Sequence, residues 1–234
     1  MASLVAAARS VLSPLTEVTR LASLRRSTSL YSQGQAADSL YIVDEGMVKL
    51  TRSNSSNGKI LLGIFGPGQV VGEESLLDEP PAAYYADAEV LTASVVFRVP
   101  RAVITGVLLA TSELASTLCS AIIRQKIALA EKVELLCLHD VEYRILHYLA
   151  ELSTLVPQSQ EEPVGHQLPI TQLELADLIG ATRETTSTML NQLERRHLVK
   201  LSRRLLTVPS PQALREAVLE RQASAHGVTA TAVS

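Results

Sequence analysis

The side chains best suited to recognise another molecule are Arg183 and Glu184, which open the stretch RETTSTMLNQLERR. An arginine can bond both acceptors on the edge of a guanine, and a carboxylate can accept from the amino group of a cytosine. Ser187 and Thr188 follow one helical turn later and could reach a base, a thymine methyl group or a phosphate. These residue types at this spacing predict the reading of base edges in double-stranded DNA.

Two short helices joined at a glycine are expected to position these side chains. Thr171 and Glu174 have the spacing of a capping box, which begins the first helix, and Gly180 ends it in a left-handed conformation. Thr182 caps a second helix that begins at Arg183. The inward faces should carry Leu175, Ala176 and Ile179 on the first helix and Thr186, Met189, Leu190 and Leu193 on the second. The pattern predicts a helix-turn-helix, with Thr171 as a further DNA contact.

Positive charge gathers around the second helix. Residues 183–204 contain six basic and two acidic residues, a local charge of +4, although the whole chain has 21 basic and 24 acidic residues. The following segment, LVKLSRRLLTV, predicts a β-hairpin wing whose tip residues Arg203 and Arg204 contact phosphates. An ordinary pair of core helices with a solvated face remains the alternative at this point.

The N-terminal part of the chain has a different residue pattern. From Tyr31 to Val99 short alternating segments are separated by turn residues, as in SLYIVDEG, MVKLT and ASVVFRV. Strands at this spacing predict a small antiparallel barrel or sandwich. Residues 1–30 are expected to form a loosely helical lead-in.

Helical patterns fill the chain beyond Pro100. Residues 101–138 are expected to be helical, with an apolar seam that suits packing against a second copy of the chain: Ile122, Leu129, Val133 and Leu136. DVEYRILHYLAEL predicts a further amphipathic helix. We therefore expect an α+β protein divided into residues 1–108, a dimerisation helix at 109–138, a DNA-binding domain at 139–222 and a disordered tail at 223–234.

Several classes of protein are disfavoured. No apolar run approaches the roughly 20 residues of a membrane span, so we expect a cytoplasmic protein with no membrane partner. Cys119 and Cys137 are too few for a four-thiolate iron-sulfur cluster, and we expect them to be buried structural thiols. The five histidines lie outside residues 31–108, which leaves a cupin-like metalloenzyme or a haem sensor without ligands there. We expect no cofactor, no metal and no catalytic residue.

The order of these parts resembles the Crp/Fnr family of bacterial transcription regulators. The resemblance rests on GQAADSLYIVDEGMVKLTRS, FGPGQVVGEESLL and TQLELADLIGATRETTSTMLNQLERRHLVK. It implies an N-terminal antiparallel β-roll, which is a cyclic-nucleotide-binding-like jelly roll, then a long dimerisation helix and a C-terminal winged helix-turn-helix. It also implies a homodimer that reads a two-fold symmetric DNA site, with RNA polymerase as a partner.

Two departures from the family pattern concern specificity and control. The family often has an arginine where Thr188 stands. Its phosphate-binding cassette matches at Gly72 and Glu73, but the cassette positions for arginine and serine fall on Tyr84 and Tyr85. Without a guanidinium, a buried phosphodiester would lack a counter-charge, so cyclic AMP is not expected as the effector.

Three alternatives for control remain open. In YYADAEVL, Tyr84 shares a strand face with Ala86, Ala88 and Val90, so we expect it to point into the roll. It could fill the ligand cavity there as a core residue, in which case the effector is absent. It could instead stack on, or hydrogen-bond, an unknown effector. The third alternative is a cyclic-nucleotide-dependent regulator with altered phosphate contacts.

Overall fold

The computed structural model describes residues 4–7, 9–10, 17–55, 58–77, 82–156, 165–202 and 205–230, with side chains to Gln222. The chain forms two compact units, Met1–Glu131 and Lys132–Ser234. A long helix, α3 (Ser112–Leu138), begins in the first unit and ends in the second. The domain limits expected from the sequence stay predictions.

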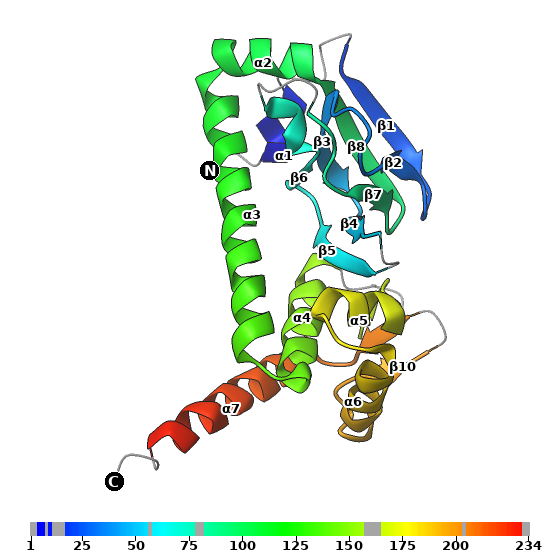
Figure 1. The fold of residues 1–234 in the computed structure, drawn as a ribbon, viewed down its shortest axis with the longest axis vertical. Helices are drawn as coiled ribbons and strands as arrows, with labels where there is room; N and C mark the ends of the chain where they lie inside the picture. Colours follow the sequence, from blue (N-terminus) through cyan, green and yellow to red (C-terminus); the bar gives the residue numbers. More distant parts are fainter. Residues whose placement is uncertain are drawn as a thin grey trace. The chain divides into compact units, whose positions relative to one another are not determined.

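The first unit contains two four-stranded antiparallel sheets (Figure 1). Their strand orders are β1-β8-β3-β6 and β2-β7-β4-β5. The strands are β1 (Thr19–Leu24), β2 (Ser29–Tyr31), β3 (Ser39–Glu45), β4 (Val48–Ser53), β5 (Lys59–Phe65), β6 (Val70–Val71), β7 (Asp87–Val90) and β8 (Ser94–Pro100). Strands β3 to β8 lie in the segments whose alternation predicted strands. The predicted antiparallel β-roll is therefore confirmed.

Apolar side chains form two clusters in this unit. One lies inside the roll and includes Val48 and Leu50 of β4 together with Tyr31, Ala88 and Tyr84. The other joins β3 and β8 to the helices α1 (Leu4–Ala7), α2 (Arg101–Ala110) and α3, and it contains Leu4, Leu40, Ile42, Val70, Phe97, Val99, Ile104, Leu114, Leu118 and Ala121. Alternate residues of a strand point to opposite faces, so β3 contributes to both clusters.

The expectation of a loosely helical lead-in is wrong for most of its described residues. Only the four residues of α1 are α-helical, whereas β1 pairs with β8 and β2 pairs with β7. Tertiary contacts explain the difference, because Arg9 and Arg20 both bond the buried carboxylate of Asp44, at 2.9 and 3.4 Å. A buried carboxylate requires such partners, and their positions were not evident from the sequence.

Helix α3 packs on the roll through one face only. The predicted continuous helix breaks at Thr111, where α2 ends and α3 begins. Ile122 of the predicted seam packs partly against the cluster that contains Leu118. The other three seam residues are exposed, as are further apolar residues of α3: Leu129, Val133 and Leu136, with Ile123, Ile127 and Leu138.

The two cysteines do not lie in the core. Cys119 and Cys137 are both exposed, so the expectation of buried thiols is wrong. The 18 residues between them are close to five helical turns, which places both on one side of α3 with the exposed Ile123 and Val133. This side is opposite the one that packs on the roll.

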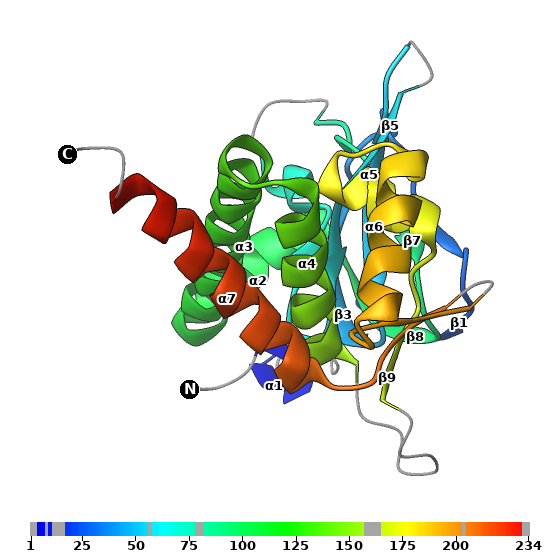
Figure 2. The same cartoon turned by 90° about the horizontal axis from the view of Figure 1, so that it is seen from below.

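The second unit is a small helical domain with a three-stranded sheet of order β10-β11-β9. The helix α4 packs against the three later helices and β9 (Figure 2). The elements are α4 (Val141–Leu155), β9 (His166–Leu168), α5 (Gln172–Ile179), α6 (Arg183–Arg195), β10 (Lys200–Leu201), β11 (Leu206–Val208) and α7 (Pro211–Ala230). Helix α7 continues to Ala230, whereas the sequence predicted a disordered tail from residue 223; no proline after Pro211 interrupts the helix up to Ala230.

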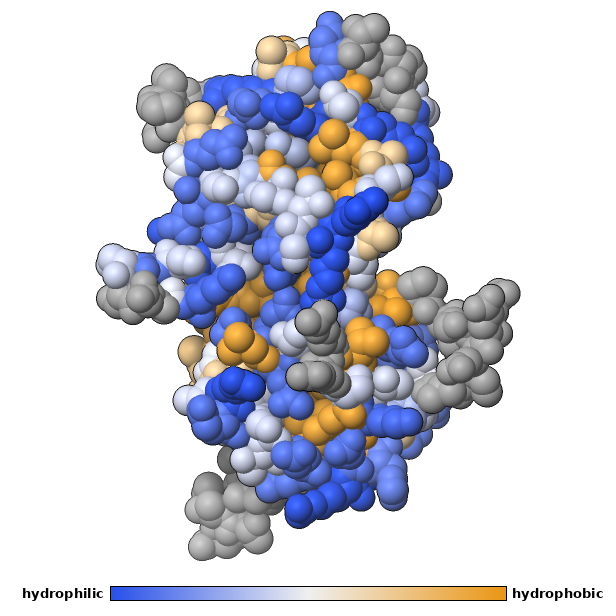
Figure 3. Space-filling model, turned by 90° about the vertical axis from the view of Figure 1, so that its right-hand side faces the viewer, coloured by the Kyte–Doolittle hydropathy of each residue, from blue (hydrophilic) through white to orange (hydrophobic). Residues whose placement is uncertain are grey.

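No single helix in the described part of the chain is long and apolar enough to cross a bilayer. Helices α2 and α3 taken together have the length and apolar composition of a candidate span, but they are bent by 117° where they meet. On the face shown in Figure 3, apolar residues form separate patches among hydrophilic ones.

Candidate DNA interface and the Tyr84 cluster

Helix α5 begins at the predicted capping box. The Thr171 hydroxyl accepts from the Glu174 amide at 3.1 Å, and the Glu174 carboxylate accepts from the Thr171 amide at 2.9 Å. The same hydroxyl also donates to that carboxylate at 2.8 Å. Thr171 therefore has a structural role at the start of the helix, and its contact with DNA stays a prediction.

The turn after α5 is fixed by contacts with α3 and α4. Gly180 has φ of 63°, the left-handed conformation that the sequence predicted. A Cβ at this position would lie 3.0 Å from the side chain of Leu136. Arg144 of α4 donates to the Ile179 carbonyl at 2.7 Å and so satisfies one of the free carbonyls at the end of α5. Sequence reasoning missed Arg144, because the contact spans 35 residues.

Helix α6 is capped and oriented by its own threonines. The Thr182 hydroxyl accepts from the Thr185 amide at 3.2 Å, as predicted. Thr186 is fully buried, and its hydroxyl donates to the Thr182 carbonyl at 2.9 Å. Leu190 and Leu193 are also fully buried, so these inward positions are confirmed.

The opposite side of α6 presents the predicted reading residues to solvent. Arg183, Glu184 and Thr188 are exposed, and Ser187 is half-buried. Arg183, Glu184 and Ser187 make no side-chain hydrogen bond or ion pair with the described part of the chain. DNA would not have to displace protein partners from these side chains, so they are available for contacts with base edges.

The basic patch behind α6 is smaller than the sequence indicated. Arg196 is paired with Glu142 of α4 at 2.5 Å, so its charge is already balanced within the unit. Arg195 and Lys200 are exposed. The wing hairpin of β10 and β11 is present with the predicted pairing. Its predicted tip contacts, Arg203 and Arg204, lie outside the described residues.

The cassette glycine sits in a tight place in the roll. Gly72 follows β6 with φ of 80° and begins the 3-10 helix η2 (Glu73–Leu76). A Cβ on Gly72 would meet the Ser39 carbonyl at 3.0 Å and the Tyr84 ring at 3.1 Å. Burial raises the pKa of the half-buried Glu73, and the neighbouring carboxylate of Glu74 raises it further.

Tyr84 points into the roll and is 2% exposed. Its ring stacks on that of Tyr31, with centroids 3.8 Å apart and planes 15° apart, and Tyr41 lies beside Tyr31 at 5.5 Å. We call these three residues the Tyr84 cluster. The main chain of Tyr84 is fixed by two hydrogen bonds of 2.9 Å, with Gln35 and Gly34. The predicted inward orientation of Tyr84 is confirmed.

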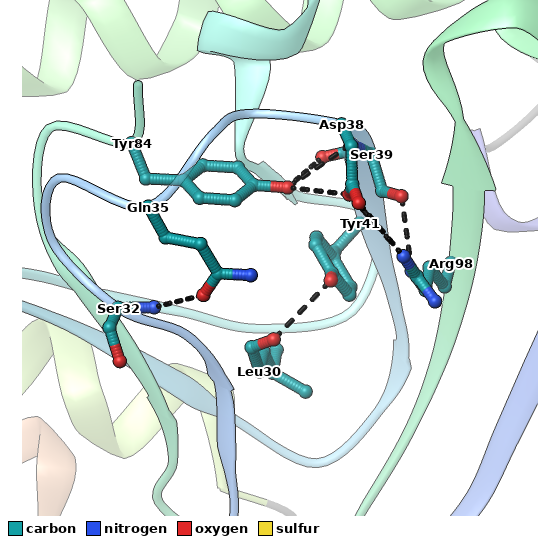
Figure 4. A network of polar contacts seen from close by, with 8 residues as sticks. All are labelled: Leu30, Ser32, Gln35, Asp38, Ser39, Tyr41, Tyr84 and Arg98. Carbon is teal, nitrogen blue, oxygen red and sulfur yellow. Dashed lines mark hydrogen bonds and ion pairs between the residues drawn. The ribbon is translucent and has the colours of Figure 1, made fainter.

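The Tyr84 hydroxyl completes the edge of β3 (Figure 4). It donates to the Ser39 carbonyl at 2.8 Å and accepts from the Ser39 amide at 3.1 Å. Main-chain groups alternate between the two edges of a strand, and Val43 bonds with Gln69 and Gly68 on this edge. Strand β6 ends before it reaches Ser39, so the hydroxyl takes the place of a strand partner.

Polar contacts connect this hydroxyl to β8 and α2. Arg98 bonds the Ser39 hydroxyl at 3.0 Å and the Asp38 carboxylate at 3.3 Å (Figure 4). Burial raises the pKa of Asp38, but hydrogen bonds from Ser39 and Arg98 outweigh this and leave it below its ordinary value. The Asp38 carbonyl accepts from the amide of Arg101, the first residue of α2, at 2.8 Å. Burial also raises the pKa of Tyr84, so its hydroxyl keeps its proton.

Tyr85 points the other way and is 55% exposed. The guanidinium of Arg52 lies 3.7 Å above its ring and bonds its carbonyl. The Tyr85 amide donates to Glu74 at 2.9 Å. Sequence reasoning missed Arg52 and Glu74 at this position, since Arg52 comes from β4, 33 residues away.

Within the described ranges, no group of three or more His, Cys, Asp and Glu side chains could hold a metal ion.

Two family models match the chain, a cyclic nucleotide-binding domain at residues 21–110 and a Crp-like helix-turn-helix domain at residues 143–217. The cAMP-activated global transcriptional regulator CRP of Salmonella typhimurium is 26% identical over 77% of this chain and 85% of its own. The Global nitrogen regulator of Synechococcus elongatus is 24% identical over 81% of this chain and 85% of its own. The solved structure of a CRP-family transcriptional regulator from Thermus thermophilus gives a TM-score of 0.71 at 26% identity, covering 86% of this chain and 96% of that one.

Proposed function

The chain belongs to the Crp/Fnr family of transcription regulators, and we propose that it acts as a homodimer that needs no cyclic nucleotide to bind its operator. The relatives are DNA-binding regulators and not enzymes, so the cupin-like alternative is set aside. RNA polymerase as a partner and the cytoplasm as the place of action belong to the same proposal.

One α6 helix of the dimer would read each half of a two-fold symmetric site. Arg183 and Glu184 at the start of α6 support this role most directly, because both are exposed and neither side chain pairs with a described residue. Arg183 suits guanine, Glu184 suits cytosine, and Ser187 lies one turn further along the same side. Thr171 and the wing residues Arg203 and Arg204 would contact phosphates, which fix the register of the protein on the duplex.

The exposed apolar side of α3 supports the homodimer. Ile123, Ile127, Leu129 and Val133 are each more than half exposed in the single chain. Two copies of α3 packed together would bury these side chains, and each buried methylene contributes about 0.8 kcal/mol. A two-fold axis between the helices would give the dimer the symmetry of its operator.

The Tyr84 cluster supports independence from a cyclic nucleotide. Gly72 and Glu73 of the cassette are present, but Tyr84 and Tyr85 replace its arginine and serine. The Tyr84 ring packs on Tyr31, and its hydroxyl bonds the Ser39 main chain. We infer that this side chain occupies the place of the effector and holds the roll in one state.

That state would be passed to the helices through main-chain contacts. Asp38 precedes Ser39, and its carbonyl accepts from the amide of Arg101, the first residue of α2. Gln125 of α3 donates to the carbonyl of Val70, two residues before the cassette glycine Gly72, at 2.7 Å. A ligand could shift this arrangement only by binding another state of the roll better.

The proposal is tested by selecting bound sequences from a random duplex pool with no added nucleotide. We expect a two-fold symmetric site with half-sites about 34 Å apart. Arg183→Ala should lose its preference at one base pair per half-site, at a cost of about 1–3 kcal/mol each. If the wild-type protein enriches no symmetric site at low salt without ligand, the proposal is wrong.

Calorimetry with cyclic AMP and cyclic GMP separates the remaining alternative. Arg52 is the observation that favours it, because its guanidinium lies beside Tyr85. Binding that is lost in Arg52→Ala, together with enrichment that requires the nucleotide, would establish altered phosphate contacts. We expect neither nucleotide to bind, since Arg52 already bonds the Tyr85 carbonyl.

A further inference from the structure

Thr188 is the predicted reading residue for which the structure most limits the groups that can contact DNA. It lies four residues after Glu184 and is exposed on the same side of α6. Its hydroxyl donates to the Glu184 carbonyl at 3.0 Å. This is the common bond of a helical threonine to the preceding turn. The proton of the hydroxyl is therefore used within the helix.

The bond limits what Thr188 can offer to DNA. A hydroxyl has one proton to donate, so Thr188 cannot also donate to the acceptors of guanine or to a phosphate. The hydroxyl oxygen can still accept from the amino group of a base, and the methyl group remains available for an apolar contact. Among the four bases, only thymine presents a methyl group in the major groove.

We propose that Thr188 selects a thymine in each half-site through contact between the two methyl groups. The inference rests on the proposed function, because it assumes that α6 enters the major groove. Residues four apart on a helix are about 6 Å apart, and base pairs stack every 3.4 Å or so. The thymine should therefore lie within about two base pairs of the base that Glu184 reads.

The test uses the operator obtained by selection and a substitution in the DNA. Replacing the selected thymine by deoxyuridine removes only the methyl group and keeps every hydrogen-bonding atom. We expect wild-type affinity to fall about fourfold when one half-site is changed, as for one methylene group returned to water. Changing both half-sites should reduce it about sixteenfold, since distant sites contribute additively.

Two protein variants assign the effect to the methyl group of Thr188. Thr188→Val keeps a methyl group and removes the hydroxyl, so it should retain the preference for thymine over deoxyuridine. Thr188→Ser keeps the hydroxyl and removes the methyl group, so it should bind both duplexes equally. A preference for thymine over deoxyuridine that is kept in Thr188→Ser, which lacks the methyl group, or lost in Thr188→Val, which retains one, overturns the proposal.

The wild-type measurement does not depend on whether a variant folds. It also distinguishes failure of the role of Thr188 from failure of the proposed function. A symmetric site with no difference between thymine and deoxyuridine refutes the role of Thr188 and leaves the proposed function intact. A selection that yields no symmetric site refutes the proposed function itself.

Discussion

Replacing Tyr84 by phenylalanine would remove one oxygen atom and leave the ring against Tyr31. The amide and carbonyl of Ser39 would lose their partner, and Ser39 is 0% exposed. A buried polar group without a partner costs about 1–3 kcal/mol. We expect the free energy of unfolding of the first unit to fall by about 2 kcal/mol. For a unit of this size, that lowers its Tm by about 8 °C.

Thermal unfolding and amide hydrogen exchange would measure the two consequences. The Ser39 amide should be protected from exchange in the wild-type protein and exchange faster in Tyr84→Phe. Tyr85→Phe is the matched control, because the Tyr85 hydroxyl bonds none of the described residues and its ring is exposed. Its Tm should change little. Equal Tm values for Tyr84→Phe and wild type, or equal losses in both variants, would refute the role of the hydroxyl as a strand partner.

Substitutions at Gly180 and Lys132 test the second unit, with matched substitutions at Gly106 and Lys126 in the first unit. Gly180→Ala should destabilise the second unit by about 1–2 kcal/mol, because the new Cβ meets Leu136 in a left-handed backbone. Gly106→Ala in α2, where a Cβ meets nothing within 4 Å, should instead raise the stability of the first unit in the same thermal assay. Burial lowers the pKa of Lys132 from 10.5 to about 8, so the unfolded chain binds more protons between these values and stability should rise with pH from 8 to 10. The urea midpoint should no longer rise with pH in Lys132→Met. It should still rise in Lys126→Met, whose side chain is exposed. Equal slopes of the urea midpoint against pH in the two variants would contradict the assignment of the rise to Lys132.

Local signals explain what the sequence predicted well. The caps at Thr171 and Thr182 act on amides three residues away, and Gly180 acts through its own φ angle. The alternation from Tyr84 to Val90 determined which side chains face the roll. Each of these inferences needed only neighbouring residues, because a cap or a strand face is set within a few positions.

Distant contacts explain what the sequence did not predict. The bond of Tyr84 with Ser39 joins residues 45 apart, and the pair of Arg196 with Glu142 joins residues 54 apart. Strand β1 was missed because its pairing with β8 is what makes it a strand. The sequence alone does not show which partner a charged or hydroxyl side chain will contact after folding.

The side chain of Tyr84 also describes a molecule that could replace it. The whole side chain corresponds to p-cresol attached to the main chain, and it is held between the flat ring of Tyr31 and the main-chain amide and carbonyl of Ser39. Cavities engineered by removing a buried side chain bind small aromatic compounds of matching shape. A Tyr84→Gly variant would present such a cavity with its polar end already in place. Chemical complementation by a diffusible phenol would then make transcription respond to an added compound.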